Sequence, residues 1–485
     1  MKSLPSLALL CSLGMLHAAD LPHFRAENGV VQLLVSGRPY LIRGGELGNS
    51  SSAAAEQADA ILPAMARLHL NTVLMPVAWE QLEPREGVFD FTILDHWIDV
   101  ARRQQLHLVL LWFGSWKNAF SEYAPAWVKS DPRRFPRAQS AHGVPLEILS
   151  TFGAETLRAD ARAFRTLMAH LRDSDRDQQT VLMIQVENEM GYLGPARDRS
   201  PEAGRQFAAP VPPDLIPALT AHHAELSPKL AAHFNSQGHT WREVFGDAAN
   251  EVFMAWRYAV YRATAPAIDF YAPDIYWPEF EYWVQRYKLP ANPVFIPEAR
   301  LDPAPWNVLY AYGAAHAIGF CPFAIDSVPA DPEPPIAQLY SAIAGLEDLL
   351  LTAQREGRTR GLVLHANSPR ATQSVALGGY VFEASLSRAW GTNVLQANDG
   401  GMLLLESQPG EFLVLGSGLT VKITRDPDTD ANIAGIASVE EVFRSGANWT
   451  VKARLNGDQT NQGRQLTMDP RQFRTYRLRL YSTQP

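Results

Sequence analysis

From residue 41 to about residue 327, short apolar runs alternate with longer amphipathic stretches. The runs have the length of buried parallel strands, and the stretches between them have helical periodicity. Strands are predicted at residues 41–47, 72–79, 107–113, 181–189, 268–276, 293–298 and 317–326. Helices are predicted at residues 53–68, 91–104, 157–171 and 241–264. This alternation predicts a (β/α)8 barrel or a doubly wound sheet.

A closed eight-stranded barrel needs one more strand than this pattern supplies. Residues 190–267 offer no convincing strand, although a fifth strand belongs there. A gap in a barrel leaves unpaired backbone groups on the two flanking strands. Three outcomes are open: a neighbouring segment fills the gap, strands four and six pair directly in a seven-stranded barrel, or the protein is damaged. We therefore expect a (β/α)8-type TIM barrel with a missing or degenerate fifth strand.

After about residue 352, the pattern changes to an alternation of period two with Gly-rich turns. In residues 419–424 (LTVKIT) and 476–480 (YRLRL), apolar and polar side chains alternate as they do in half-buried strands. This pattern predicts a C-terminal β-sandwich. The expected domains are the barrel at residues 20–355 and the sandwich at residues 356–485.

The N-terminus predicts export. Residues 1–19 contain Lys2, then an apolar run over residues 4–16, and then small residues, as in a secretory signal peptide. No later run reaches the roughly 18 apolar residues of a membrane span, so no membrane anchor is expected once the signal is removed. Removal of Cys11 with the signal leaves Cys321 alone, which excludes an intrachain disulfide.

Composition and motifs narrow the possible functions. The 485 residues carry 43 Lys and Arg against 51 Asp and Glu, a net charge of −8 that argues against nucleic-acid binding. Hydrophobic residues make up 46% and charged residues 19%, as in globular chains. Zinc, phosphate-loop, dinucleotide and nucleophile-elbow motifs are absent from the sequence, so neither a metal nor a cofactor is expected.

Two predicted strands end in carboxylates. The fourth ends in Glu187, Asn188 and Glu189, and the seventh ends in Glu298. Barrel active sites lie at the C-terminal ends of the strands, and polar groups at the end of a buried strand are costly unless they have partners. A salt bridge at the barrel rim would explain them, but two glutamates on facing strand ends also match the acid and the nucleophile of a glycoside hydrolase. We favour catalysis.

The sequence resembles a known family along nearly all of the mature chain. VENEMG at residues 186–191 is similar to the acid/base strand of glycoside hydrolase family 35, whose members are chiefly β-galactosidases of a clan of retaining (β/α)8 enzymes. VAWEQLEPREGVFDF at residues 77–91 and LWFGSWKNAFSEYAPAW at residues 111–127 are similar to the second-strand and third-strand regions of a bacterial branch. The likeness continues through FIPEAR and GFCPFAID at residues 295–300 and 319–326.

The resemblance implies roles for individual residues. Glu189 would be the acid/base and Glu298 the nucleophile of a retaining mechanism, with Asn188 bonded to the sugar 2-hydroxyl. Tyr276 would hold the nucleophile, and Glu187 would contact ring hydroxyls. Family position also suggests sugar contacts for two residues near the barrel mouth, Trp116 and Asn118.

Two of the neighbouring positions have simpler explanations. Lys117, between Trp116 and Asn118, is expected to be solvated, as loop lysines usually are. Glu46 follows the first strand and either contacts the sugar or pairs with Arg43.

The leading hypothesis is an exo-acting retaining β-galactosidase, periplasmic or secreted by a bacterium. It would remove terminal galactose from plant-type oligosaccharides or polysaccharide side chains. The alternatives are a catalytically impaired carbohydrate-binding barrel, favoured by the missing strand, and a retaining glycosidase of another sugar specificity. The sequence does not indicate the oligomeric state.

Overall fold

The structure is a computed structural model. It describes residues 21–190, 197–221, 223, 228–246, 265, 267–289, 292–368, 370–389, 392–426 and 433–483. The predicted signal peptide lies outside these residues, as does most of the helix predicted at residues 241–264. None of the described helices is both long and apolar enough to cross a membrane.

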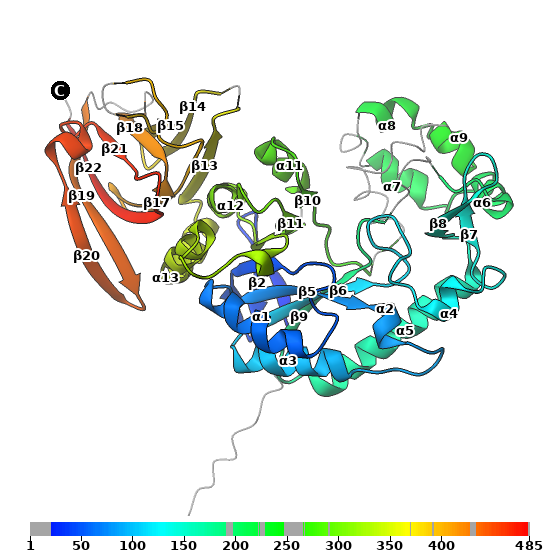
Figure 1. The fold of residues 1–485 in the computed structure, drawn as a ribbon. Coiled ribbons are helices and arrows are strands. Elements are labelled where there is room, and N and C mark those ends of the chain that lie inside the picture. The colour runs from blue at the N-terminus through cyan, green and yellow to red at the C-terminus, as the bar shows by residue number, and fades with distance from the viewer. Residues whose placement is uncertain are drawn as a thin grey trace, which may run out of the picture.

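All seven predicted strands of the first part of the chain belong to one parallel sheet (Figure 1). They are β4 (Ile42–Glu46), β5 (Thr72–Ala78), β6 (His107–Phe113), β9 (Val181–Val186), β10 (Asp274–Ile275), β11 (Phe295–Ala299) and β12 (Gly319–Pro322). Their order in the sheet is β10-β11-β12-β4-β5-β6-β9. Consecutive strands of this sheet pair with each other as in a TIM barrel, and the last strand pairs with the first, except that β9 and β10 lie at opposite ends of the sheet.

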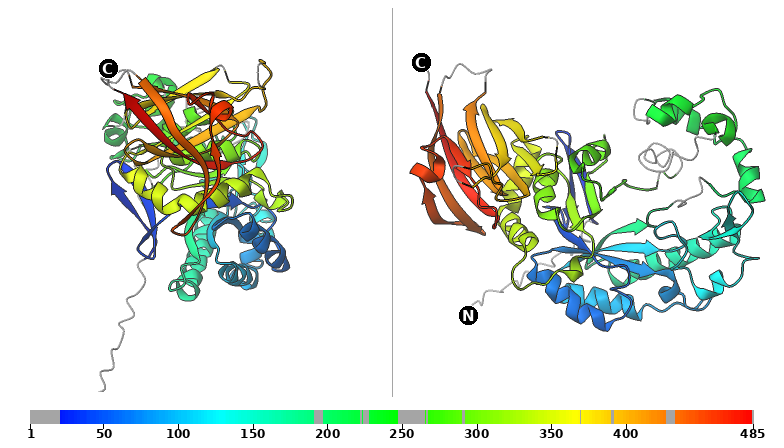
Figure 2. Two further views of the ribbon diagram at one scale, coloured as in Figure 1. Left: turned by 90° about the vertical axis from the view of Figure 1, so that its left-hand side faces the viewer. Right: turned by 45° about the horizontal axis from the view of Figure 1, so that its top comes forward.

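The sheet is curled but open (Figure 2). In the part of the chain that the structure describes, β9 pairs with β6 alone and β10 with β11 alone. The direct pairing of strands four and six in a closed barrel is therefore wrong. The sixth strand is also shorter than predicted, because Pro273 lacks an N–H donor and restricts the backbone of Ala272 before it.

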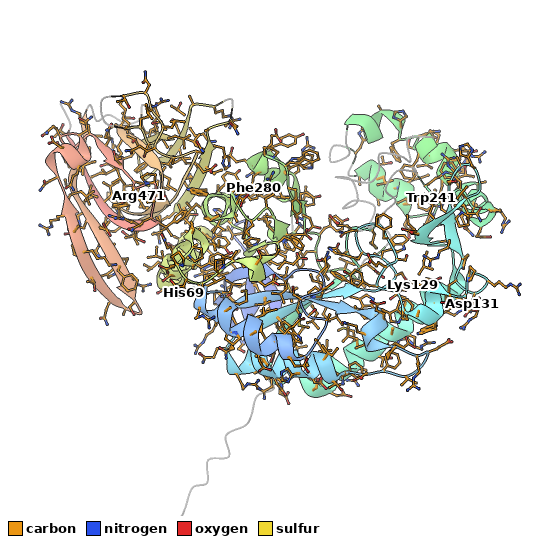
Figure 3. All side chains as sticks on the ribbon, in the orientation of Figure 1. His69, Lys129, Asp131, Trp241, Phe280 and Arg471 are labelled. Carbon is orange, nitrogen blue, oxygen red and sulfur yellow. The ribbon has the colours of Figure 1, made fainter. Side chains whose placement is uncertain are left out.

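Helices cover the outer face of the sheet. They are α1 (Glu56–Arg67), α2 (Trp79–Leu82), α3 (Thr92–Arg103), α5 (Ala154–Ser174), α11 (Phe280–Tyr287), α12 (Ala304–Gly313) and α13 (Pro335–Arg355). Alternate residues of β6 serve the two faces: Leu108, Leu110 and Trp112 pack in the outer core with the helices, whereas Val109, Leu111 and Phe113 pack in the inner core. Phe280 lies at the start of α11 (Figure 3). Its buried ring packs against Tyr310 and Phe320.

Two smaller units flank the sheet. An antiparallel sheet of β1 (His23–Glu27), β2 (Val30–Val35) and β3 (Arg38–Tyr40) contributes Leu33 and Val35 to the inner core. The Tyr40 hydroxyl bonds to Thr72 at the start of β5, so this sheet lies at the N-terminal end of the barrel strands. On the side away from the C-terminal strands lies an arm (Figure 1) of α4 (Ala126–Lys129), β7 (Arg137–Gln139), β8 (Pro145–Leu149), α6 (Pro201–Phe207), α7 (Leu215–Ala221), α8 (Pro228–His233) and α9 (Trp241–Phe245).

The C-terminal part consists of two antiparallel sheets, as the alternating pattern predicts. One contains β13 (Thr359–His365), β16 (Asp399–Gln408), β17 (Glu411–Ser417), β22 (Arg474–Thr483), β19 (Ile433–Ser445) and β20 (Asn448–Leu455). The other contains β14 (Thr372–Leu377), β15 (Tyr380–Leu386), β18 (Leu419–Arg425) and β21 (Gln465–Thr467). Side chains such as Phe382, Phe412 and Tyr476 form a core of their own.

The larger of these sheets packs directly on α12 and α13. Leu403 and Leu405 of β16 belong to the same hydrophobic cluster as the barrel helices. The backbones approach closely at Gly361 of β13, where a Cβ atom would lie 2.5 Å from the carbonyl oxygen of Leu309. Glycine is therefore required there by close packing.

Candidate active site

The C-terminal ends of the parallel strands bring polar side chains together at one edge of the sheet. Glu46 ends β4, Asp274 begins the short β10 and pairs in register with Glu298 of β11, and Asn188 follows β9. Glu46 is 1% exposed, Asn188 2% and Glu298 5%. Groups of this polarity are buried in proteins when they have partners or a function.

A local irregularity of β11 directs Glu298 toward the inside. The pairing of β11 with β12 shifts register between Ile296 and Ala299, and both of these residues pack in the outer core. Regular alternation would put Glu298 on the same face as Ile296. The shift instead leaves Glu298 on the inner side, which is a common use of a β-bulge beside a functional site.

Tyr276 and Glu46 surround Glu298. The Tyr276 hydroxyl donates a hydrogen bond to Glu298 Oε1. Burial raises the pKa of Tyr276 well above its usual value, and the hydrogen bond to Glu298 raises it further. Burial, followed by the charges of Glu298 and Asp274, raises the pKa of Glu46 well above that of an ordinary glutamate.

Glu46 does not pair with Arg43. The Arg43 guanidinium bonds instead to Glu347 on α13. Of the two explanations for Glu46, the structural ion pair is therefore wrong, and the carboxyl group lies among the acidic groups at the strand ends.

Lys117 is buried, contrary to its expected solvation. The side chain is 4% exposed, and Nζ lies 4.9 Å from the centre of the Phe113 ring. Nζ donates a hydrogen bond of 2.8 Å to Asn188 Oδ1. Because this bond identifies the amide oxygen, the Asn188 Nδ2 group is the side that can donate to a ligand.

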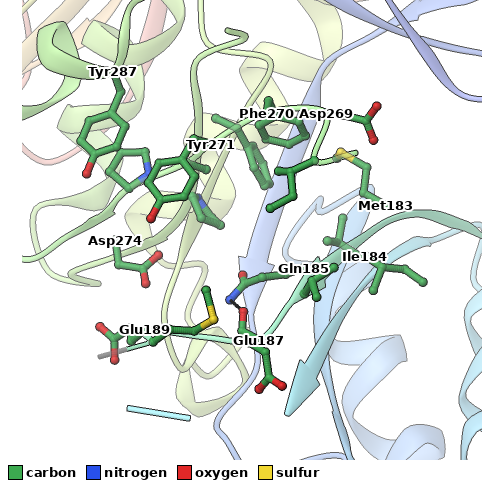
Figure 4. A pocket seen from close by; sticks show the side chains of 18 of the residues that line it. Met183, Ile184, Gln185, Glu187, Glu189, Asp269, Phe270, Tyr271, Asp274 and Tyr287 are labelled. Atoms are coloured by element: carbon green, nitrogen blue, oxygen red, sulfur yellow. Dashed lines mark hydrogen bonds between the residues drawn. The ribbon is translucent and has the colours of Figure 1, made fainter. Parts of the chain in front are cut away.

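Glu187 is engaged in the loop after β6. Its carboxylate accepts hydrogen bonds from the backbone N–H groups of Ser115 and Trp116, at 3.0 and 2.8 Å. Burial and the neighbouring Asp160 raise the pKa of Glu187 well above its usual value. The Glu187 carboxylate points away from that of Glu189 (Figure 4). Its hydrogen bonds to Ser115 and Trp116 hold the loop after β6. Contact with ring hydroxyls stays a prediction.

Glu189 and Asn118 line a cavity of about 880 Å³ beside β9 (Figure 4). Both are exposed and have positive φ angles, 45° for Glu189 and 51° for Asn118. Such angles are uncommon for residues other than glycine and occur often at functional sites. The cavity extends along residues 267–275, on the open side of the sheet.

The side chain of Trp116, which is predicted to contact the sugar, forms a hydrogen bond within the protein. The Trp116 indole N–H donates to the Leu149 carbonyl, at 3.2 Å. Trp277, which also lines the cavity, is 60% exposed and presents a free aromatic surface.

Sequence reasoning did not single out Asp160 or Asp274. Asp160 lies within α5, where nothing in the helical pattern indicates that it meets Glu187. Asp274 could have been found, since it stands two residues before Tyr276 at a predicted strand end. Among the described residues, no group of three or more His, Cys, Asp or Glu side chains could hold a metal ion.

Two family models match separate parts of the chain. Residues 49–245 match the family model of glycoside hydrolase family 42, described as Beta-galactosidase. Residues 336–467 match a second family model, described as a domain of unknown function (DUF5597). A search of curated proteins gives no match.

The solved structures that match this chain are distant from it in sequence and have low TM-scores. One is a family 39 glycoside hydrolase from Bacteroides cellulosilyticus WH2, with 10% identity and a TM-score of 0.41 over 93% of this chain and 84% of that one. An endo-1,4-β-mannanase from Rhizomucor miehei has 12% identity and a TM-score of 0.37 over 63% of this chain and 90% of that one. An exo-β-1,4-mannosidase from Opitutaceae bacterium strain TAV5 has 19% identity and a TM-score of 0.26 over 37% and 29%.

These TM-scores are low, and the family match carries the assignment. It agrees with the activity class that the resemblance implied, while membership of family 35 in particular stays a prediction. By this match, the part of the chain that holds Glu187, Asn188 and Glu189 is similar to β-galactosidases, and the protein is of glycosidase type.

Proposed function

We propose that the protein is an exo-acting retaining β-galactosidase of the family 35 type. Its substrates are terminal β-galactosyl residues of plant-type oligosaccharides or polysaccharide side chains. The observation that carries the proposal is the inward-facing Glu298, buried and bonded to Tyr276, on the same sheet edge as the strand that leads into Glu189.

In the first step, a Glu298 oxygen forms a bond to the anomeric carbon while the glycosidic C–O bond breaks. Glu189 gives its proton to the departing oxygen. In the second step, Glu189 takes a proton from water, the water oxygen bonds to the anomeric carbon, and Glu298 leaves as a carboxylate. Asn188, oriented by Lys117, donates from Nδ2 to the sugar 2-hydroxyl.

The accessible Glu189 and the enclosed Glu298 suit these roles. An acid/base must meet both the leaving group and water, and Glu189 is exposed at the cavity. A nucleophile benefits from exclusion of water and from a fixed donor, and Glu298 is buried and receives the Tyr276 hydrogen bond.

The test is hydrolysis of chromogenic glycosides by the mature protein. We expect turnover of the β-galactoside by the wild type. The turnover rate should fall by about 10²-fold or more in Glu189→Ala and in Glu298→Ala. It should not change in Glu356→Ala, which alters an exposed glutamate beyond α13. Proton NMR of the first-formed galactose should show the β anomer. Hydrolysis of another glycoside in place of the galactoside would assign the site a different sugar.

The open sheet favours a second candidate, a carbohydrate-binding protein without turnover. The described residues between β9 and β10 supply no barrel strand, so the pocket has one strand end fewer than a closed eight-stranded barrel, while the buried polar groups remain. Galactose binding by protein with a cooperative melt, together with no turnover of any glycoside, would establish this candidate and overturn the enzyme.

A further inference from the structure

Two buried carboxyl oxygens, one on the proposed nucleophile and one on a neighbouring glutamate, lack hydrogen-bond donors. They are Glu46 Oε1 and Glu298 Oε2, and no N–H or O–H donor among the described residues bonds to either of them. Ionised carboxylates accept hydrogen bonds and donate none, so two adjacent carboxylates cannot satisfy each other. A single proton placed between them would satisfy both atoms.

The sheet places the two side chains next to each other. β4 and β11 both flank β12, so their backbones lie about 10 Å apart at strand spacings of about 4.8 Å. Glu46 shares the inner face with Ile42 by alternation, and the bulge turns Glu298 to that face. The two carboxyl groups come within hydrogen-bonding reach.

The residues beneath the pair are closely packed. Between the two strands lies the buried thiol of Cys321, and a Cβ atom at Gly44 would come within 2.4 Å of its sulfur. Burial raises the pKa of this thiol, which keeps it neutral. The pair therefore rests on a packed, uncharged surface.

The surroundings indicate which carboxyl carries the proton. Glu298 already receives a hydrogen bond from Tyr276, and a donated bond stabilises the ionised form. Glu46 faces Glu298 and Asp274, which together with burial raise its pKa, while the charge of Lys117 opposes them. The proton therefore belongs to Glu46.

We propose that Glu46 is a positioning residue that stays protonated and donates a hydrogen bond to Glu298 Oε2, so that Glu298 is held as an ionised nucleophile between two donors. The idea rests on the proposed role of Glu298. It differs from sugar binding by Glu46, because it assigns the Glu46 proton to Glu298 and not to the substrate.

One test reads the proton directly and needs no turnover. The infrared difference between wild type and Glu46→Gln should show the carbonyl band of a protonated carboxylic acid in the wild type near neutral pH. Glu83→Gln is the matched control, because Glu83 is equally buried but bonded to Arg162, the Gly87 N–H and Trp79. It should show no such band. Absence of the band from the Glu46 difference would overturn the proposal, even if the protein hydrolyses galactosides.

A second test uses kinetics with folded variants. Glu46→Gln retains a donor and should keep kcat within about threefold, whereas Glu46→Leu removes it and should lower kcat by about 10² with little change in KM. A rise of KM in both variants with kcat preserved would indicate a sugar contact and contradict the proposal. Wild type that shows the band but no turnover would disprove the hydrolase and leave the Glu46 proton established.

Discussion

Substitution of Glu187 by glutamine tests whether the second buried acidic pair also holds a proton. Glu187 Oε1 and Oε2 accept the Ser115 and Trp116 N–H groups, and Asp160 Oδ2 also accepts from Ser115 N, at 2.9 Å. Burial and Asp160 raise the pKa of Glu187. In the folded protein, Glu187 therefore keeps a proton at pH values where the unfolded chain has released it.

The magnitude follows from these contacts. In Glu187→Gln the amide oxygen can accept from Trp116 N, the amide N–H can donate to Asp160, and Ser115 N keeps its bond to Asp160. The cost near neutral pH should be below about 1 kcal/mol. Glu187→Ala leaves the Trp116 N–H without this acceptor and should cost about 1–3 kcal/mol.

The pH dependence has a defined sign. Because the folded state binds one proton more than the unfolded state above the unfolded pKa of about 4.3, wild-type stability falls as pH rises, by about 1.4 kcal/mol per pH unit, until the raised folded pKa is passed. Glutamine has no such proton. The stability of Glu187→Gln relative to wild type should therefore increase with pH over this window.

Urea unfolding at several pH values between about pH 5 and about pH 7 measures this difference. Effects of groups that do not interact with Glu187, such as Glu46, cancel because both proteins contain them. A difference that stays constant with pH, or a glutamine variant as unstable as the alanine variant at neutral pH, would refute a protonated Glu187.

Two further substitutions test contacts described above. Tyr276→Phe removes a donor to Glu298 and should lower kcat about tenfold with KM little changed, in steady-state kinetics on a β-galactoside; an unchanged kcat would contradict the proposed role. Gly361→Ala forces a Cβ atom toward the Leu309 carbonyl and should lower the free energy of unfolding by about 1–3 kcal/mol, while Gly204→Ala, which has open space in α6, should not destabilise. Equal melts for the two alanine variants would contradict the close approach.

Much of the fold could be predicted from local sequence. Apolar runs such as residues 107–113 are buried on both faces, so their composition alone marks them as strands. Closure of the sheet could not be predicted, because it depends on whether the last strands meet across the gap. The length of β10 was overestimated from hydrophobicity, although Pro273 carried the relevant signal.

The site was predictable where a residue ends a strand. Glu46 and Glu298 lie at such positions, and the structure brings them into one cluster. The burial of Lys117 was not predictable, since it depends on Phe113 and on Asn188, which lies on a different strand end. The register shift after Ile296 is likewise invisible in FIPEA, yet it determines which way Glu298 faces.

The packing of β16 on α12 and α13 limits how freely the C-terminal sheets could be exchanged in evolution. Removal of these strands would expose to water the helix faces that now pack against Leu403 and Leu405. The free-energy cost would be about 25 cal/mol for each Å² of apolar surface exposed. The match of one family model to residues 336–467, which begins in α13, fits this dependence. The matched segment therefore combines α13 with most of the strands that pack on the barrel, and removal of the strands alone would expose apolar helix surface and favour aggregation.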